Sequence, residues 1–222
     1  MEYQIHFHDA HPVIHTEEDR ILIDTGSPNS YHEKSTFRFM GRDFRSSGGG
    51  SAPDLHHLSK LVGTKISCLL GMDIMKEFST ELRFSENKVR FSEGTLNMSG
   101  RTLEYFDGMG VPVIHVDMLD QSRRMYLDTG ARLSYIHDEL TAHLPVTGYD
   151  RDFYPGYGRF ETDLFLLKGS LLDRTFQLKC GHLPIGLKKL LLWGHTEGIL
   201  GYDFFKEFNV GIDVRQKVIC IS

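Results

Sequence analysis

The chain has 222 residues, of which 40% are hydrophobic and 25% are charged, and its formal net charge at pH 7 is −5. This composition is ordinary for a soluble globular protein, and the length allows one large domain or two small lobes. The acidic balance argues against nucleic acid as a partner, and no apolar run approaches the ~18 residues that a membrane-spanning helix needs.

The N-terminal residues and the cysteines bear on the cellular compartment. The chain begins Met1-Glu2-Tyr3-Gln4, without the basic and then apolar pattern of a secretion signal. Its three cysteines, Cys68, Cys180 and Cys220, are far apart and lack Cys-x-x-Cys spacing. Such cysteines are typical of free or buried thiols in a reducing compartment. We therefore expect a cytoplasmic protein.

The sequence motif Asp-Thr-Gly occurs twice in this chain, each time directly after a hydrophobic run. Asp24-Thr25-Gly26-Ser27 follows Ile21-Leu22-Ile23, and Asp128-Thr129-Gly130-Ala131 follows Met125-Tyr126-Leu127. Each copy is followed, at the same offset, by Ser-Tyr. A single Asp-Thr-Gly would indicate only a turn. Two copies in matched surroundings indicate a duplicated half, with one carboxylate available from each.

The similarity of the two halves extends beyond this motif. Pro12-Val13-Ile14-His15 recurs as Pro112-Val113-Ile114-His115, upstream of each aspartate. Downstream, residues 69–78 match residues 199–208, and a hairpin pattern follows each segment. Blocks in the same order in both halves indicate an internal duplication. We divide the chain into lobes of residues 1–97 and 98–222, at a polar stretch between the repeats.

Alternating polar and apolar residues predict a mostly β structure with few, short helices. We expect strands within 34–45, 160–168 and 175–179, and a buried strand at 190–193 that contains Trp193. We expect a helix over 53–62, two short helices with Asp73 and Asp203 as N-caps, and a helical turn within 137–143. The Ser- and Gly-rich segment 46–53 is expected to be a surface loop.

These features resemble the aspartic peptidases of the retropepsin and pepsin group. Members share two hydrophobic residues before Asp-Thr/Ser-Gly, and later two hydrophobic residues before a Gly that leads into a short helix. Leu69-Leu70-Gly71 and Ile199-Leu200-Gly201 match the second signature. The resemblance implies an all-β, bilobal pepsin/retropepsin-like acid protease fold with pseudo-two-fold symmetry and a few short helices. Because both halves lie in one chain, we expect a monomer.

The same resemblance assigns the catalytic dyad to Asp24 and Asp128. Two carboxylates close together cannot both ionise cheaply, so they would share one proton. The charged member would polarise a water molecule, and the protonated member would hydrogen-bond the scissile carbonyl. Thr25 and Thr129 would brace the loops by hydroxyl-to-backbone hydrogen bonds across the lobe interface. The expected function is an aspartic endopeptidase that needs no metal and no organic cofactor.

The remaining positions of the two loops receive supporting roles from the resemblance. Gly26 and Gly130 would let the backbone pass close to the carboxylates. Ser27 would hydrogen-bond the outer oxygen of Asp24, as in pepsins, whereas Ala131 at the equivalent place is similar to retropepsins.

The resemblance also implies a peptide or protein substrate in extended conformation, held between the lobes and a β-hairpin flap. Gly48-Gly49-Gly50 lies at about the retropepsin flap distance, but the surrounding segment is short for a complete flap. The second half is longer between Asp128 and Gly201, and residues 153–158 are another candidate for the flap tip. The sequence leaves open which half covers the substrate and assigns no substrate-binding residue.

Two other functions are compatible with the sequence. The same fold could bind extended peptides without cutting them. His6, His8 and His11, together with His56-His57, suggest a metal site. No Cys, Asp or Glu cluster completes a ligand set, so we expect hydrogen-bonded or solvent-facing histidines and no bound metal.

Overall fold

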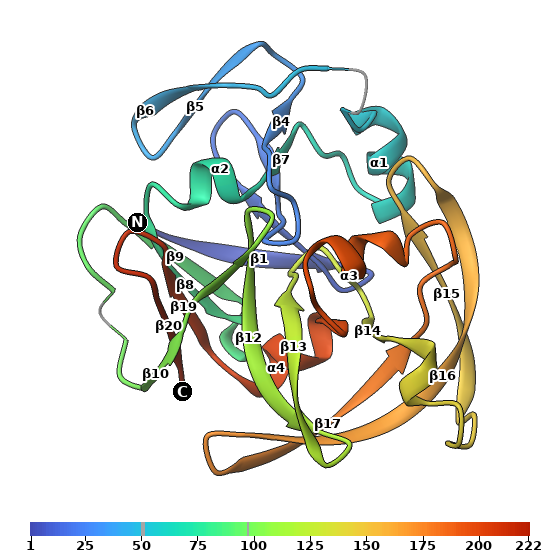
Figure 1. Cartoon of the computed structure of the whole chain (residues 1–222). Helices are drawn as coiled ribbons and strands as arrows, with labels where there is room; N and C mark the ends of the chain where they lie inside the picture. The colour runs from blue at the N-terminus through green and yellow to red at the C-terminus, as the bar shows by residue number, and fades with distance from the viewer. Residues whose placement is uncertain (50–51, 97) are drawn as a thin grey trace.

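The computed structural model describes residues 1–49, 52–96 and 98–222. It has the bilobal all-β architecture with few short helices that the sequence predicts (Figure 1). In the described part of the chain, the strands form two large sheets and one separate hairpin. Residues 50 and 51 of the expected loop, and residue 97 at the expected lobe boundary, lie outside the described residues.

Strands occupy the segments in which polar and apolar residues alternate. Those of the first half are β1 (Glu2–His8), β2 (His11–His15), β3 (Arg20–Ile23), β4 (Tyr31–His32), β5 (Thr36–Phe39), β6 (Arg42–Arg45), β7 (Cys68–Leu70), β8 (Ser79–Arg83) and β9 (Lys88–Ser92). Those of the second half are β10 (Arg101–Glu104), β11 (Phe106–Gly108), β12 (Val111–Met118), β13 (Gln121–Leu127), β14 (Ser134–Ile136), β15 (Gly148–Tyr154), β16 (Gly158–Leu171), β17 (Arg174–Gly181), β18 (Gly198–Leu200), β19 (Val210–Asp213) and β20 (Val218–Ile221).

The first of the two large sheets contains strands of both halves, and the second contains strands of the second half. The first runs in the order β10-β20-β19-β8-β9-β1-β2-β3-β7-β4, and the second in the order β11-β12-β13-β18-β14-β17-β16-β15. In the first sheet β19 is antiparallel to β8, with Ile212 opposite Thr80. That sheet therefore takes β10, β19 and β20 from beyond residue 97, and the division of the chain at that point stays a prediction.

The same pairing pattern surrounds the two Asp-Thr-Gly loops. β3 is parallel to β7 with Ile23 opposite Leu70, and β13 is parallel to β18 with Leu127 opposite Leu200. β4 and β14 then pair antiparallel with β7 and β18. The two halves therefore present equivalent loops at the ends of equivalent strands, as a pseudo-two-fold arrangement requires.

The helix expected over 53–62 is confirmed as α1 (Leu55–Val62). Asp54 caps it by accepting two backbone N–H groups of the first turn, and Gly63 ends it in the left-handed region at φ 83°. Its buried residues lie on one face at helical spacing and are Leu55, Leu58 and Val62. They pack in a cluster with Val13, Leu22 and Leu69, so α1 covers β2, β3 and β7 beside the first loop.

The N-caps expected at Asp73 and Asp203 are wrong by two residues. Gly71 and Gly201 occupy the N-cap positions, and both aspartates lie in the first turn. A Cβ on either glycine would lie 2.3 Å from a backbone oxygen of the preceding loop. Each helix thus starts where the chain packs too tightly for a side chain. The helices are α2 (Met72–Met75) and α4 (Tyr202–Glu207).

The buried strand expected at 190–193 is also wrong. These residues belong to helix α3 (Lys189–Trp193), and Leu191 is the one that faces the core. Leu192 is 65% exposed and Trp193 is 55% exposed. A short apolar run does not by itself distinguish a strand from a helix. The helical turn expected within 137–143 is present as the single turn Asp138–Leu140.

The main hydrophobic core contains residues of both halves. Ile23 and Leu127, the last residues of β3 and β13, lie in it together, so the loops that follow start from a common base. Cys68, Cys180 and Cys220 are all buried free thiols, as expected. Among the described residues, no helix has the length and apolar character needed to cross a membrane.

Candidate active site

Asp24 and Asp128 stand at equivalent places, directly after β3 and β13. The backbone N–H of Asp24 donates to the carbonyl of Leu70 at 3.0 Å, and that of Asp128 donates to Leu200 at 3.1 Å. In each loop the backbone carbonyl of the aspartate then accepts a hydrogen bond from the backbone N–H of the third residue after it, which is Ser27 or Ala131. The distance is 3.3 Å in both halves. The backbone thus turns at both aspartates in the same way.

Each carboxyl group lies against the glycine of the opposite loop. A Cβ on Gly26 would lie 2.1 Å from Cγ of Asp128, and a Cβ on Gly130 would lie 2.6 Å from Cγ of Asp24. Both distances are far below van der Waals contact, so glycine alone fits at the two positions. The fold therefore brings the two carboxyl groups, which are far apart in the sequence, into one site.

Thr25 and Thr129 join the two loops to each other. Each hydroxyl accepts from the backbone N–H of the other threonine, at 3.0 and 2.9 Å. The hydroxyl of Thr25 donates to Leu127 at 2.8 Å, and that of Thr129 donates to Ile23 at 2.7 Å. Both threonines are fully buried. The hydroxyl-to-backbone bonds that the resemblance implies are therefore present in both directions and fix the loops relative to one another.

Burial raises the pKa of both aspartates. The pKa of Asp24 lies well above its usual value, because of burial first and the neighbouring charge of Asp128 second. Burial raises the pKa of Asp128 to about 6, although the backbone N–H groups of Gly130 and Ala131 favour its charged form. Two buried carboxyl groups in contact are best described as one unit that retains a proton at mildly acidic pH.

The hydrogen bonds to the two carboxyl groups differ. Oδ1 of Asp128 accepts from the N–H of Gly130 at 2.8 Å and from that of Ala131 at 3.1 Å. Oδ1 of Asp24 is buried and meets no donor among the described residues. Because a buried carboxyl oxygen needs a partner, a proton held between Asp24 and Asp128 would satisfy this atom.

Ser27 does not make the contact expected from pepsins. Its hydroxyl donates to the carbonyl of Asn29 at 2.7 Å, within its own loop, instead of to Asp24. Local bonds of this kind are common for serine in turns. The backbone N–H of Ser27, like that of Gly26, opposes the rise in the pKa of Asp24. Ser27 and Ala131 therefore both act on the carboxyl groups through their backbone.

Comparison with solved structures identifies this architecture. The chain is similar to the aspartic proteinase from Irpex lacteus, with a TM-score of 0.53 and 11% sequence identity over 100% of this chain and 96% of that chain. This chain has the pepsin-like acid protease fold. A retropepsin-like aspartic protease from Rickettsia conorii aligns with a TM-score of 0.38 and 15% identity over 57% of this chain and 96% of that chain. No protein-family model and no curated protein matches the sequence.

Two serines to which the sequence assigned no role support the two Asp-Thr-Gly loops. The hydroxyl of Ser30 accepts from the N–H of Gly71 at 2.8 Å, and that of Ser134 accepts from Gly201 at 3.0 Å. Both serines are fully buried. They connect each aspartate loop to the glycine that starts the following helix. The signal that reveals them is the Ser-Tyr pair at the same offset after each Asp-Thr-Gly.

Tyr154 is the last residue of β15. Burial raises the pKa of Tyr154 to about 12, and the charges of Asp128 and Asp24 add to the shift. Even so, 39% of its surface is exposed. It belongs to the second-half candidate for the flap, residues 153–158. The first-half candidate, Gly48-Gly49-Gly50, includes residue 50, which lies outside the described residues.

The N-terminal histidines make ring contacts. The rings of His6 and His15 stack with centroids 4.4 Å apart, and His11 stacks on Phe153 at 5.2 Å. Within residues 1–49, 52–96 and 98–222, no group of three or more His, Cys, Asp or Glu side chains is placed to hold a metal ion. These residues therefore do not form the metal-ligand set that their sequence suggests.

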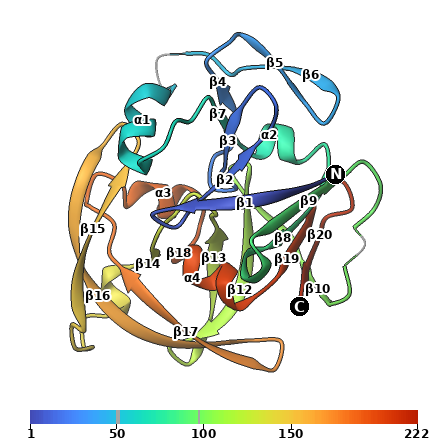
Figure 2. The same ribbon diagram turned by 180° about the vertical axis from the view of Figure 1, so that it is seen from behind.

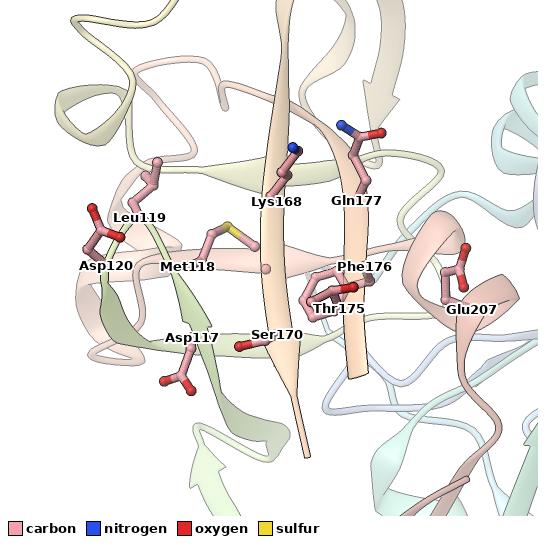
Figure 3. A pocket seen from close by; sticks show the side chains of 11 residues that line it. Asp117, Met118, Leu119, Asp120, Lys168, Ser170, Thr175, Phe176, Gln177 and Glu207 are labelled. Atoms are coloured by element: carbon pink, nitrogen blue, oxygen red, sulfur yellow. The ribbon is translucent and has the colours of Figure 1, made fainter. Parts of the chain in front are cut away.

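A hollow of about 680 Å³ lies away from the aspartates, beside β16, β17 and the turn between β12 and β13 (Figure 3). Its polar lining includes Asp117, Lys168, Gln177 and Glu207. Neither aspartate of the pair lines it. The paired loops, rather than this hollow, are therefore the candidate active site.

Proposed function

We propose that this chain is an aspartic endopeptidase, which hydrolyses peptide bonds with a water molecule activated between Asp24 and Asp128. The observation that carries the proposal is the crossed placement of two buried carboxyl groups, each against the glycine of the opposite loop. The raised pKa of both groups supports a pair that holds one proton. Such a pair supplies a base and an acid at the same place.

In the proposed reaction, the charged carboxylate takes a proton from the water molecule as its oxygen attacks the scissile carbonyl carbon. The protonated carboxyl group gives its proton to the carbonyl oxygen, and a tetrahedral diol forms. A proton then passes from the pair to the amide nitrogen, and one from a diol hydroxyl returns to the pair. The C–N bond breaks to give a carboxylic acid and an amine, and the pair again holds one proton.

The proposal extends to the state of the protein and its substrate. Since one chain supplies both aspartates, we propose that it acts as a monomer. We propose an extended peptide or protein segment as the substrate, because an extended backbone exposes its amides to such a site. The three unpaired thiols support a cytoplasmic location.

The test is cleavage of a diverse peptide pool, read by mass spectrometry at acidic to neutral pH. Wild type is compared with Asp24→Asn, Asp128→Asn and the exposed control Asp43→Asn. Cleavage should fall by about 10²- to 10⁴-fold in both dyad variants and persist in the control. Cuts that survive in both dyad variants would contradict the proposal. Peptides that bind wild type and are never cut would favour a peptide-binding module on the same fold.

A further inference from the structure

The repeat also carries a histidine–arginine pair in each half, apart from the aspartate loops. His15 of β2 lies opposite Arg20 of β3, and His115 of β12 lies opposite Arg124 of β13. Each arginine precedes the aspartate of its half by four residues. The strands that carry the pairs run side by side (β2 and β3 in Figure 2, β12 and β13 in Figure 1). The two side chains of each pair are therefore neighbours on one face of the sheet.

A ring on the neighbouring strand completes each pair to a set of three side chains. His6 of β1 and Phe106 of β11 lie opposite equivalent valines of the repeat. The ring of His6 stacks on that of His15 with centroids 4.4 Å apart, and the ring of Phe106 lies beside that of His115 with centroids 5.0 Å apart. The first-half set and the second-half set therefore share one layout and differ in this ring.

The guanidinium group of Arg124 has a donor without an acceptor. It lies over the ring of Phe106, with Cζ 5.5 Å from the ring centroid. Its Nε is buried and meets no acceptor in the described part of the chain. The carboxylate of Glu197, near in sequence to the next strand, pairs with Arg123 instead. A buried donor of this kind needs a partner, and the planar guanidinium fork suits a carboxylate.

A hollow of about 240 Å³ adjoins this guanidinium group. Its walls are Leu103 and Glu104 of β10, Phe106 of β11 and His115 of β12. Arg124 lies over one of these residues and opposite another. The volume is below the ~300–1,000 Å³ of pockets that hold drug-sized ligands. The hollow therefore suits a molecule of about the size of a single amino acid.

The charged groups at the hollow have both signs. Glu104 is exposed, and within residues 1–49, 52–96 and 98–222 it has no ion-pair partner. Nδ1 of His115 lies 3.3 Å from the hydroxyl of Ser122. When Nδ1 accepts from this hydroxyl, the neutral ring carries its proton on Nε2, which can donate to a ligand. Glu104 repels an anion and Arg124 repels a cation, so a molecule with one charge of each sign matches the hollow best.

The first-half set is more open to solvent. The side chains of His6, His15 and Arg20 are all exposed, whereas Arg124 is partly buried. An exposed guanidinium group is solvated by water and gains little from an ion pair. Arg20 therefore offers a matched control for Arg124, at the equivalent position of the repeat.

We propose that the hollow beside β10, β11 and β12 is a binding site for a small zwitterion of amino-acid size with an apolar side chain. Arg124 and His115 bind its carboxylate, and Glu104 binds its ammonium group. Leu103 and Phe106 contact its apolar part. This site is separate from the aspartate pair and does not depend on the proposed hydrolysis.

The first test is calorimetric titration of wild type at pH 7 with leucine, N-acetylleucine and leucinamide. N-acetylleucine lacks the ammonium group, and leucinamide lacks the carboxylate. Leucine should bind with a Kd of about 1 mM or tighter. Each analogue should bind at least about tenfold more weakly, because it leaves one charged group of the site unpaired. Absence of leucine binding at about 10 mM, or equal binding of all three compounds, would overturn the proposal.

The second test assigns each charge of the ligand to a residue. Arg124→Ala should weaken leucine binding about tenfold or more and remove the preference for leucine over leucinamide. Glu104→Gln should instead remove the preference for leucine over N-acetylleucine. Arg20→Ala should leave both preferences unchanged. Preferences that persist in both site variants, or an equal loss of binding in Arg20→Ala, would overturn the assignment.

Thermal melts keep the second test decisive if Arg124→Ala does not fold. Arg124→Gln removes the charge but keeps most of the side chain that lies over Phe106, and it should melt cooperatively. Leucine should raise the Tm of wild type and of Arg20→Ala, because a ligand that binds the folded state stabilises it. The shift should be lost in Arg124→Gln together with the preference for leucine over leucinamide. A folded Arg124→Gln variant that retains this preference would contradict the proposed carboxylate contact.

Discussion

The two halves of this chain agree closely at their aspartate loops and differ in the hairpin that follows. Ile23 lies opposite Leu70 in the sheet, as Leu127 lies opposite Leu200. Asp24 directly follows Ile23, and Asp128 directly follows Leu127. Between these strands, the first half has the short β5–β6 hairpin and the second half has the longer β15–β16 hairpin. The first hairpin packs Phe37 and Phe39 into the main core, whereas Phe153 of the second packs against the first-half cluster.

This difference separates two requirements of the site. Under the proposed function, a shared proton needs two carboxyl groups in contact, and the two aspartate loops bring them together. Contact with one asymmetric peptide does not need two equivalent covers. Under the proposed function, the two halves are alike where the chemistry needs a pair of carboxyl groups, and they differ in the length of the hairpin that follows.

Gly26→Ala and Gly130→Ala should have the largest effects. Each new methyl group would displace the opposite carboxyl group, since the Cβ positions lie 2.1 and 2.6 Å from Cγ. We expect cleavage to fall by about 10²-fold or more, and the free energy of unfolding to fall by about 1–3 kcal/mol. Gly94→Ala is the matched control, because Gly94 is exposed and the nearest atom to its Cβ position, Oγ of Ser92, lies 3.5 Å away. If one variant were harmless, the halves would not contribute equally to the site.

Thr25→Val and Thr129→Val should each cost about 1–3 kcal/mol of the free energy of unfolding, because buried backbone groups lose their hydroxyl partner. Urea unfolding measures this, and Thr→Ser at each position should restore most of the loss. The double variant should cost less than the sum, since both hydroxyls belong to one network. A loss confined to one of the two threonines would break the equivalence of the loops.

The aspartate pair should make stability fall as pH rises from about 4 to about 6. Both groups have a raised pKa in the folded chain, so the folded state binds more protons than the unfolded state in this window. The stabilisation that the pair gives to the folded state is fully present at a pH below the ordinary pKa of aspartate. It is lost as the pH rises through the pKa values of the pair in the folded chain. Thermal melts of wild type and of the Asp24→Asn, Asp128→Asn double variant should diverge across the window, with the double variant gaining. Parallel curves would refute a buried, protonated pair.

Arg38→Ala should have the smallest effect. Arg38 lies in the first-half hairpin and donates to the carbonyl of Gly41 at an exposed position. We expect kcat/KM to stay unchanged and the free energy of unfolding to move by at most about 0.5 kcal/mol. A clear rise in KM would give the first hairpin a part in substrate binding.

The sequence predicts the paired loops well, because their chemistry is carried by residues in fixed order. Asp-Thr-Gly after a hydrophobic run in each half, followed by a later Gly signature, indicates that Asp24 and Asp128 meet. The threonine bonds follow from the resemblance to aspartic peptidases that these motifs carry. These features depend on short sequence motifs that occur in both halves of the chain.

Other features depend on contacts that residue order does not reveal. Leu190 to Trp193 is apolar enough for a strand, yet it forms a helix in which Leu192 and Trp193 face solvent. The hydroxyl of Ser27 donates to the carbonyl of Asn29 and not to the carboxyl group of Asp24, because the geometry of the loop places that carbonyl within reach. Arg132 looks like an ordinary charged residue until Asp9 and Asp150, distant in sequence, are placed beside it.

The most direct test of the central claim is the pH dependence of kcat/KM for one peptide, measured on wild type, Asp24→Asn and Asp128→Asn. If the two carboxyl groups work as one unit with a single proton, wild-type cleavage is present at acidic pH and declines as the pair loses that proton. Both variants then lack cleavage at every pH. Wild-type activity that stays constant up to about pH 8, or a variant that retains it, would contradict a shared-proton pair.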